Sequence, residues 1–442
     1  MRKTSLMFLI WLALAYGSAV AQITFLQAYI DKAWNKNEAL KSREFDLKSA
    51  EWSYKEAKAM YGPTLAFNAN YTLAAGGRNI SFPVGDLLNP VYNTLNSLTG
   101  TQQFNLLQNQ EINFFPNNFY DAKLVASQAI YYPDLAINQK LKGYEKEIKV
   151  LEVRAFKRQI SKEVMVASFQ VANAKALGMI YRDAGILVNE AKRATQSMVN
   201  NDVAPIIALR RIEAQLASLE AQQKEATGLY KNAQAYFQFL SGDTLAYNTL
   251  HDLPELPPMD VSAGQSREEI QQLQTLESMT ALSLDKENSY YKPRLGAQLS
   301  LGSQDFNFGW QPYALLGINL DINLFDSKRH NYRKDAAKAK MEAQQAQYQH
   351  TTDMIALQAL TTENNLRTAI DQAQLFFPRI GAANQLYKDS YNRYKEGNAN
   401  YLELLDAQTQ LTQTQIQYQI ARYNAWIKWS EWVYALAILP IP

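Results

Sequence analysis

The chain has 442 residues, with 44 basic and 42 acidic side chains and a formal net charge of +2. This near-balance argues against a nucleic-acid-binding surface, which needs a clear basic excess. There is no cysteine, and the three histidines are far apart, so the sequence excludes disulfides and thiolate chemistry and offers no metal-binding histidine motif. We predict no catalytic residue, no cofactor and no metal site, and therefore no enzyme.

Residues 1–21 have the pattern of a secretory signal peptide. The second and third residues are basic, residues 6–15 form an apolar run, and Ala19-Val20-Ala21 is a small-x-small cleavage site. A membrane anchor helix is the alternative, but the apolar run is too short to span a bilayer. No later stretch of about 18 apolar residues follows.

The next part, residues 22–241, forms a first repeat that starts with a helix and then contains two predicted strands. Residues 64–73 and 119–132 alternate apolar and polar side chains with a period of two, which is typical of strands. We expect a bulge near Gln128. Residues 74–118 between the strands are predicted to be a long loop, whose role the sequence does not reveal.

A very long helix is predicted over 134–201, because this segment is rich in Ala, Gln, Leu, Glu and Lys and contains no proline. At 1.5 Å per residue it would be about 100 Å long. A turn follows, and a return helix is predicted over 205–240, with Pro205 in its first turn. Residues 242–266 are a proline-containing link.

The second repeat, residues 267–442, has the same order of elements. It comprises a helix, strands at 294–301 and 313–324, a long helix at 326–396 and a return helix at 400–435. The sequence Tyr61-Gly-Pro63-Thr-Leu65 before the first strand is echoed by Tyr291-Lys-Pro293-Arg-Leu295 before the third, which indicates a tandem duplication.

The four strands have the length and alternation of transmembrane β-strands, which span a bilayer in about 9–11 residues. A soluble sheet with one face on a core is the alternative. Four strands cannot close a barrel by themselves, and open strand edges are not tolerated in lipid. If the strands cross a membrane, several copies of the chain must therefore share one barrel.

Five motifs stand out along the chain: Ile23–Ala33 with Asn37, Pro63-x-Leu65, Pro293-x-Leu295, Tyr394–Gly397 and Tyr401–Ala407. Taken together, the order of these motifs resembles the TolC-like family of outer-membrane efflux and type I secretion proteins, over essentially the whole mature chain. The resemblance implies a mainly α fold with a transmembrane β part. Tandem-duplicated helical hairpins would form a periplasmic α-barrel, and the four strands of each protomer would contribute to a 12-stranded barrel in a homotrimer.

By this resemblance, Glu403 and Asp406 match acidic positions at the periplasmic gate, and Tyr394 matches a tyrosine of its closing contacts. Their i, i+3 spacing places the two acids on one helix face. The alternative is that Asn400 and Glu403 simply cap a helix start. Ala399 replaces a basic residue that some members have nearby, so the way in which this end closes stays open.

The turns of the two hairpins would contact an adaptor by the same analogy, at Asn201, Asp202, Val203, Gly397 and Asn398. Arg210 and Glu213 are expected to take the places of the gate acids in the first hairpin. Further on, three tryptophans at helical spacing predict a packed stripe, at Trp426, Trp429 and Trp432.

The resemblance also implies partners and a location. These are a periplasmic adaptor, an inner-membrane pump of the RND, ABC or MFS type and outer-membrane lipid, with the helical part in the periplasm. The chain would be a duct that exports small molecules or polypeptides in a tripartite efflux or type I secretion system. The alternative is a periplasmic helical-hairpin adaptor or a structural protein of the envelope. Neither the exported substrate nor the class of pump can be read from the sequence.

Overall fold

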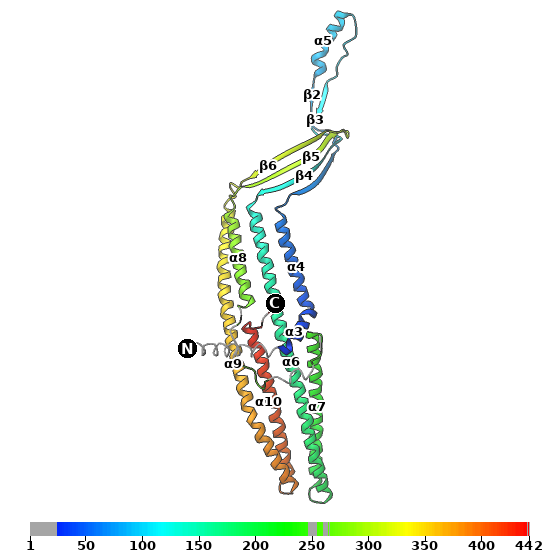
Figure 1. Ribbon diagram of the computed structural model, residues 1–442. Helices are drawn as coiled ribbons and strands as arrows, with labels where there is room; N and C mark the ends of the chain where they lie inside the picture. Colours follow the sequence, from blue (N-terminus) through cyan, green and yellow to red (C-terminus); the bar gives the residue numbers. More distant parts are fainter. Residues whose placement is uncertain (1–23, 246–253, 260–263, 265, 440, 442) are drawn as a thin grey trace, which may run out of the picture. The chain divides into compact units, whose positions relative to one another are not determined.

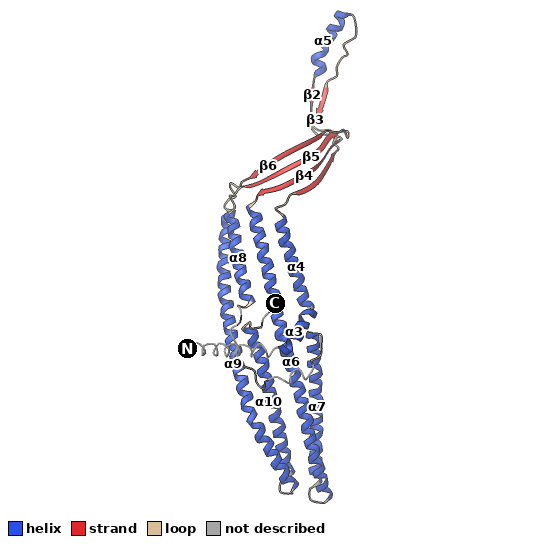
Figure 2. Ribbon diagram, viewed as in Figure 1, coloured by secondary structure: helices blue, strands red, loops and turns tan. Residues whose placement is uncertain are grey.

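The structure is a computed structural model that describes residues 24–245, 254–259, 264, 266–439 and 441. It is mainly helical with a four-stranded sheet (Figure 2). The predicted signal peptide at 1–21 and part of the predicted link at 242–266 lie outside the described residues. Within the described residues, no helix combines the length and the apolar character that crossing a membrane requires.

The chain forms two compact units. The first comprises the described parts of Met1–Glu51, Tyr144–Thr280 and Ala339–Pro442, and the second comprises Trp52–Gly143 and Ala281–Lys338. Four helices, labelled in Figure 1, have residues in both units: α4 (Glu38–Ala59), α6 (Pro133–Asn200), α8 (Glu268–Asn288) and α9 (Arg329–Lys395). With 68 and 67 residues, α6 and α9 are each about 100 Å long at 1.5 Å per residue.

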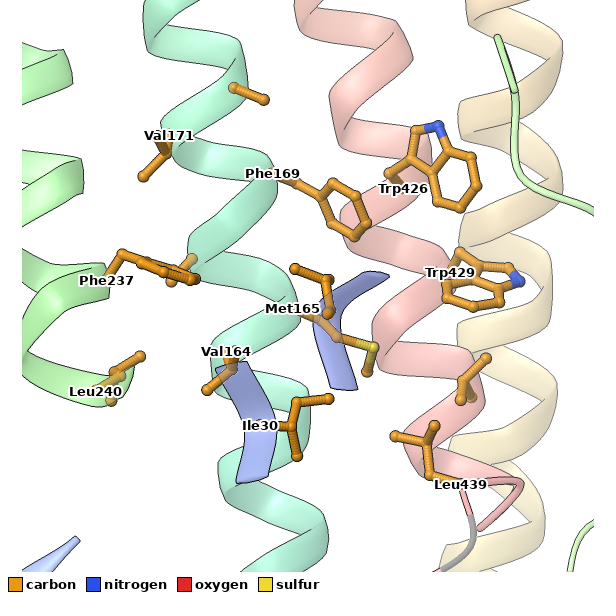
Figure 3. Packing of buried hydrophobic residues seen from close by; sticks show 14 of the residues in the cluster. Ile30, Val164, Met165, Phe169, Val171, Phe237, Leu240, Trp426, Trp429 and Leu439 are labelled. Carbon is orange, nitrogen blue, oxygen red and sulfur yellow. The ribbon is translucent and has the colours of Figure 1, made fainter. Parts of the chain in front are cut away.

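The first unit also contains α3 (Thr24–Lys36), α7 (Ile206–Ser241) and α10 (Tyr401–Ala435). Its main core lies where α6 faces α10: Phe169 points toward Trp426, at 5.4 Å between ring centroids, and Trp426 meets Trp429 edge-on at 5.5 Å (Figure 3). Trp426, Trp429 and Trp432 are all buried, so the predicted packed stripe is confirmed. Burying each large apolar side chain of this kind contributes roughly 1.5–3 kcal/mol.

The second unit contains an antiparallel sheet of β1 (Thr64–Thr72), β4 (Phe119–Tyr131), β5 (Arg294–Phe306) and β6 (Pro312–Asp321), in the order β1-β4-β5-β6. The sheet therefore joins one strand pair from each repeat, with β4 against β5. The β4–β5 register shifts between Ala129 and Tyr131, close to the bulge that was expected near Gln128.

β1 and β4 each end one residue before their predicted ranges do, and the other two strands differ by more. β5 continues five residues beyond 301, because its partner β4 starts at Phe119 and pairs with Phe306 there. β6 covers Pro312–Asp321 rather than 313–324, because Asp321 pairs with Arg294, the first residue of β5. The residue before Arg294 is a proline, which lacks the N–H that a ladder needs, so residues 322–324 have no strand to pair with.

Residues 74–118, which were predicted to be a loop, contain regular structure. β2 (Asn79–Phe82) pairs with β3 (Gln110–Asn113), and α5 (Val84–Thr99) lies between them in the sequence (Figure 1). Pro90 inside α5 obscured the helix in the sequence, because proline usually disfavours a helix interior.

Candidate functional site

The two helical hairpins of the first unit turn with the same backbone geometry. Where α6 ends, the Val203 N–H donates to the Met198 carbonyl at 2.8 Å and the Asp202 N–H donates to that of Val199 at 3.1 Å. The end of α9 has the same pattern. The Asn398 N–H donates to the Arg393 carbonyl at 2.8 Å, and the Gly397 N–H donates to the Tyr394 carbonyl at 3.0 Å. Both ends are Schellman motifs with a left-handed residue, at φ 61° for Asp202 and 78° for Gly397.

This shared geometry corrects the expected equivalence of the hairpins. Because Asp202 corresponds to Gly397, the places of Glu403 and Asp406 in the first hairpin are taken by Ala208 and Arg211, not by Arg210 and Glu213. The expected positions were two residues out of register. They followed from the similarity of Glu213-Ala214-Gln215 to Asp406-Ala407-Gln408, and the position of the turn was not used to align the hairpins. The two hairpins do differ in charge: at the second of these positions the first hairpin is basic and the second is acidic.

Among the predicted gate residues, Glu403 is held by an ion pair that no sequence pattern indicated. Its Oε1 lies 2.7 Å from Nη1 of Arg393, on the other side of the turn between α9 and α10. Asn400 caps α10, since its side chain accepts from the Leu402 N–H at 3.1 Å. The alternative prediction was that Asn400 and Glu403 cap the start of a helix. Asn400 does cap α10, whereas the Glu403 side chain pairs with Arg393. Both partners are exposed, so the pair contributes at most about 1 kcal/mol.

Asp406 lies one helical turn beyond Glu403 on α10 and is exposed as well. Its neighbours Leu404 and Ala407 are buried in the cluster between the hairpins, so the two acids occupy the outward side of the helix. Because Arg393 compensates Glu403, Asp406 carries more of the net negative charge at this end of α10.

Tyr394 is buried between the hairpins instead of projecting from them. Its hydroxyl lies 2.6 Å from Oγ1 of Thr195 on α6, and the Thr195 hydroxyl donates to the Ala191 carbonyl at 2.8 Å. Since a threonine hydroxyl has one hydrogen, Tyr394 is the donor in the shared bond. Burial raises the pKa of Tyr394. The same cause raises the pKa of Tyr387, two turns earlier on α9, to about 12, so both hydroxyls stay neutral.

Replacing Tyr394 with Phe should loosen the hairpins without emptying the core. The ring stays, but Thr195 loses the hydrogen bond that links α9 to α6, which costs about 0.5–1.5 kcal/mol. Hydrogen exchange of the α6 and α9 ends should become faster in Tyr394→Phe. Tyr391→Phe, one turn away at a half-buried tyrosine, is the matched control, and equal exchange in the two variants would contradict the role of the Thr195 bond.

All five predicted tip residues are exposed: Asn201, Asp202, Val203, Gly397 and Asn398. The apolar side chains beside them were not among the predicted contact residues. Val203 is 67% exposed, and Ile206, Ile207 and Leu402, in the first turns of α7 and α10, are exposed too. Exposed β-branched residues directly after a turn were the signal that could have drawn attention to them.

In the second unit, one side of the sheet is exposed and apolar. Residues that pair directly across neighbouring strands point to the same side, and the alternation along β1, β4, β5 and β6 therefore sorts them into two faces. We call one side the apolar face; it carries these exposed residues: Leu65, Phe67, Tyr71, Leu124, Leu299, Leu301, Leu316, Ile318 and Leu320.

The opposite side, which we call the polar face, carries amide and charged groups. On it, Nζ of Lys123 lies 2.6 Å from Asp121, and the Tyr313 hydroxyl donates to the same carboxylate at 2.7 Å. The face also holds Asn68, Asn70, Ser127, Gln298, Gln304 and Asn319. Within the described residues, the outer edges of β1 and β6 have no strand partner. The sheet is thus open, apolar on one side and polar on the other.

Comparison with known proteins gives a family match over part of the chain and several similar folds. Residues 262–431 match the family model described as "Outer membrane efflux protein". No curated protein matches the chain. The fold is similar to the outer membrane protein VceC of Vibrio cholerae, with a TM-score of 0.73, 16% identity and coverage of 95% of this chain and 98% of that one.

Two further solved structures share the fold. The Campylobacter jejuni CmeC outer membrane channel matches with a TM-score of 0.73, 14% identity and coverage of 94% and 86% of the two chains. The open state of the Neisseria gonorrhoeae MtrE outer membrane channel matches with a TM-score of 0.73, 16% identity and coverage of 93% and 89%. At 14–16% sequence identity, these matches show a shared fold alone.

Proposed function

We propose that this chain is one protomer of an outer-membrane export duct. Two findings support the proposal: residues 262–431 match the family model "Outer membrane efflux protein", and the fold is similar to those of solved outer-membrane proteins. The observation that carries the proposal is the open four-stranded sheet with its exposed apolar face. In water such a face would be costly, because apolar surface of this extent is normally covered. In a bilayer it would lie against lipid, and the polar face would line a watery channel.

Three copies of the sheet would close one barrel of 12 strands. The unpaired edges of β1 and β6 support this arrangement, since each could pair with the opposite edge strand of a neighbouring copy. Exposed apolar side chains on two helices of the first unit also support side-by-side packing of copies: Leu229, Tyr236 and Phe239 on α7, and Met354, Leu357 and Leu360 on α9.

The helices would form the periplasmic part of the duct. Its hairpin tips, with the exposed Val203, Ile206 and Ile207, would contact a periplasmic adaptor that connects the duct to an inner-membrane pump of the RND, ABC or MFS type. The duct itself would perform no bond chemistry. It would pass small molecules or polypeptides that the pump selects, in tripartite efflux or type I secretion.

Glu403 and Asp406 would form an acidic ring at the narrow periplasmic end, and such rings favour cations over anions. In planar bilayers, Asp406→Asn should reduce cation selectivity strongly. Glu403→Gln should reduce it less, because Arg393 already compensates that carboxylate. Glu213→Gln is the control, since Glu213 lies farther along its own hairpin and pairs with Lys192 at 2.9 Å. Unchanged reversal potentials in Asp406→Asn would reject the gate assignment.

The proposal as a whole is tested by envelope fractionation and gel electrophoresis with and without boiling. We expect the chain in the outer-membrane fraction as a trimer-sized band that boiling converts to a monomer. A monomer in the soluble periplasmic fraction would overturn the duct. It would favour the alternative, a periplasmic helical-hairpin adaptor or structural protein of the envelope, with the four strands as a soluble sheet.

A further inference from the structure

In the insertion between β1 and β4, the segment that follows α5 holds this helix in place by hydrogen bonds to polar side chains of the helix. The Asn89 side chain donates to the Leu107 carbonyl at 2.9 Å and accepts from the Leu107 N–H at 2.8 Å. Asn96, seven residues later, makes the same two bonds with Phe104, at 2.8 and 3.0 Å. Each side-chain amide thus makes the two hydrogen bonds that a neighbouring strand would make with the returning backbone. Together, Asn89 and Asn96 fix which side of α5 faces the segment from Phe104 to Leu107.

The start of α5 is tied down as well. The Gly85 and Asp86 N–H groups donate to the Asn109 side chain at 3.0 and 3.2 Å, which satisfies two N–H groups that a helix start leaves unpaired. A Cβ at Gly85 would lie 2.4 Å from the Leu107 carbonyl oxygen, so only glycine permits this close approach. The orientation of α5 is therefore set by the chain itself.

The other side of α5 carries an apolar stripe at alternating steps of four and three residues: Val84, Leu88, Val91, Leu95 and Leu98. This is the spacing of a coiled-coil seam, with leucine at both a positions, Leu88 and Leu95. Leu98 is 78% exposed and Val91 52%. Leu87 beside the stripe is also exposed. The stripe has the pattern of a helix–helix contact, yet three of its five residues, Leu88, Val91 and Leu98, are exposed in the single chain, and Val84 and Leu95 are half-buried.

Charge distinguishes between two possible partners of the apolar stripe on α5, a membrane surface and another helix. Helices that lie on a membrane surface carry Lys or Arg on the polar face, which attract anionic lipid. Residues 79–118 contain neither, and the polar side of α5 is made mainly of asparagines. A lipid surface therefore lacks the electrostatic attraction that it needs. An uncharged seam is suited to a partner with the same apolar spacing.

We propose that the stripe on α5 packs against the α5 helices of other copies of this chain. Leucine at a with β-branched valine at two d positions, Val84 and Val91, favours more than two strands, in agreement with three copies. The inference rests on the proposed trimer: α5 has 16 residues, too few to associate alone, and shared barrel closure would supply the high local concentration.

Cysteine cross-linking of the full chain in envelopes tests this contact, because the chain has no cysteine of its own. Leu98→Cys places a thiol in the seam at a d position. Asn93→Cys is the matched control on the same helix, at an exposed position away from the seam. Disulfides form only where Cα atoms come within about 7 Å. After mild oxidation, Leu98→Cys should run mostly as a reducible dimer and Asn93→Cys should remain a monomer on a boiled gel.

The heat-sensitive trimer band of each variant separates the possible outcomes. If the trimer forms but Leu98→Cys links no more than Asn93→Cys, the α5 contact is overturned and the duct stands. If the unlinked thiol also resists a water-soluble maleimide, lipid or another protein covers the stripe, which overturns the contact equally. If the unmodified chain forms no trimer, the proposed function fails and the contact fails with it.

Discussion

Leu316→Lys is expected to eliminate the heat-sensitive trimer from the outer-membrane fraction, whereas Leu315→Lys is expected to leave it intact. Both leucines lie in the middle of β6 and both are well exposed, at 70% and 62%. They point to opposite sides of the sheet, Leu316 to the apolar face and Leu315 to the polar face. The two variants therefore differ only in the face that receives the charge.

The size of the effect follows from the environment of each face. A lysine on the lipid side near the middle of a bilayer costs about 2–4 kcal/mol. If a trimer forms, three copies carry this cost together, so assembly should fail. On the channel side the ammonium stays in water, close to the amides of the polar face. Envelope fractionation and an unboiled gel measure the difference, with total expression from whole cells as the reference.

The comparison also discriminates between the two interpretations of the sheet. A soluble sheet whose apolar face covers a core would lose stability in Leu316→Lys, but the unmodified protein would be periplasmic. Equal trimer yields for the two lysine variants, with the unmodified chain in the membrane, would show that the apolar face does not meet lipid.

Arg158→Met is the substitution expected to destabilise the first unit most. Arg158 on α6 is 3% exposed and makes two bonds with Glu268 at the start of α8, at 2.6 and 3.0 Å. Its third bond goes to the carbonyl of Leu439, at 2.8 Å. One guanidinium thus joins three parts of the chain. Removing it leaves the Glu268 carboxylate buried without its cation, at a cost of about 3–5 kcal/mol.

An exposed ion pair on the same helix provides the control. Arg182→Met removes the partner of Asp183, but both side chains are more than half exposed, so the loss should be about 1 kcal/mol or less. The denaturant midpoint of the detergent-solubilised protein and the temperature at which the trimer band disappears should fall much further in Arg158→Met. Similar midpoints in the two variants would contradict the importance of the buried pair.

The double variant Arg158→Met with Glu268→Leu separates the cost of an unpaired charge from the loss of packing. Replacing a buried ion pair by apolar groups of similar volume is often nearly neutral. We expect the double variant to be more stable than Arg158→Met alone. A remaining deficit of about 1 kcal/mol is expected, because the Leu439 carbonyl loses its donor.

Periodicity along the chain determined much of this architecture from the sequence alone. Alternation with a period of two placed the first strand at 64–73, and β1 occupies Thr64–Thr72. The proline-free composition of 134–201 placed one long helix where α6 lies. The i, i+3 spacing put Glu403 and Asp406 on one side of α10. Such patterns can be read directly because neighbouring residues in one element share its geometry.

The tertiary structure decided what meets across large separations in the chain. Thr195 and Tyr394 are 199 residues apart, Arg158 and Glu268 are 110 apart, and no local pattern pairs them. The end of β6 was set by its partner strand, and the partner of Glu403 was set by the turn that brings Arg393 beside it. Contacts of this kind form only when separate elements pack, so a pattern within one element cannot specify them.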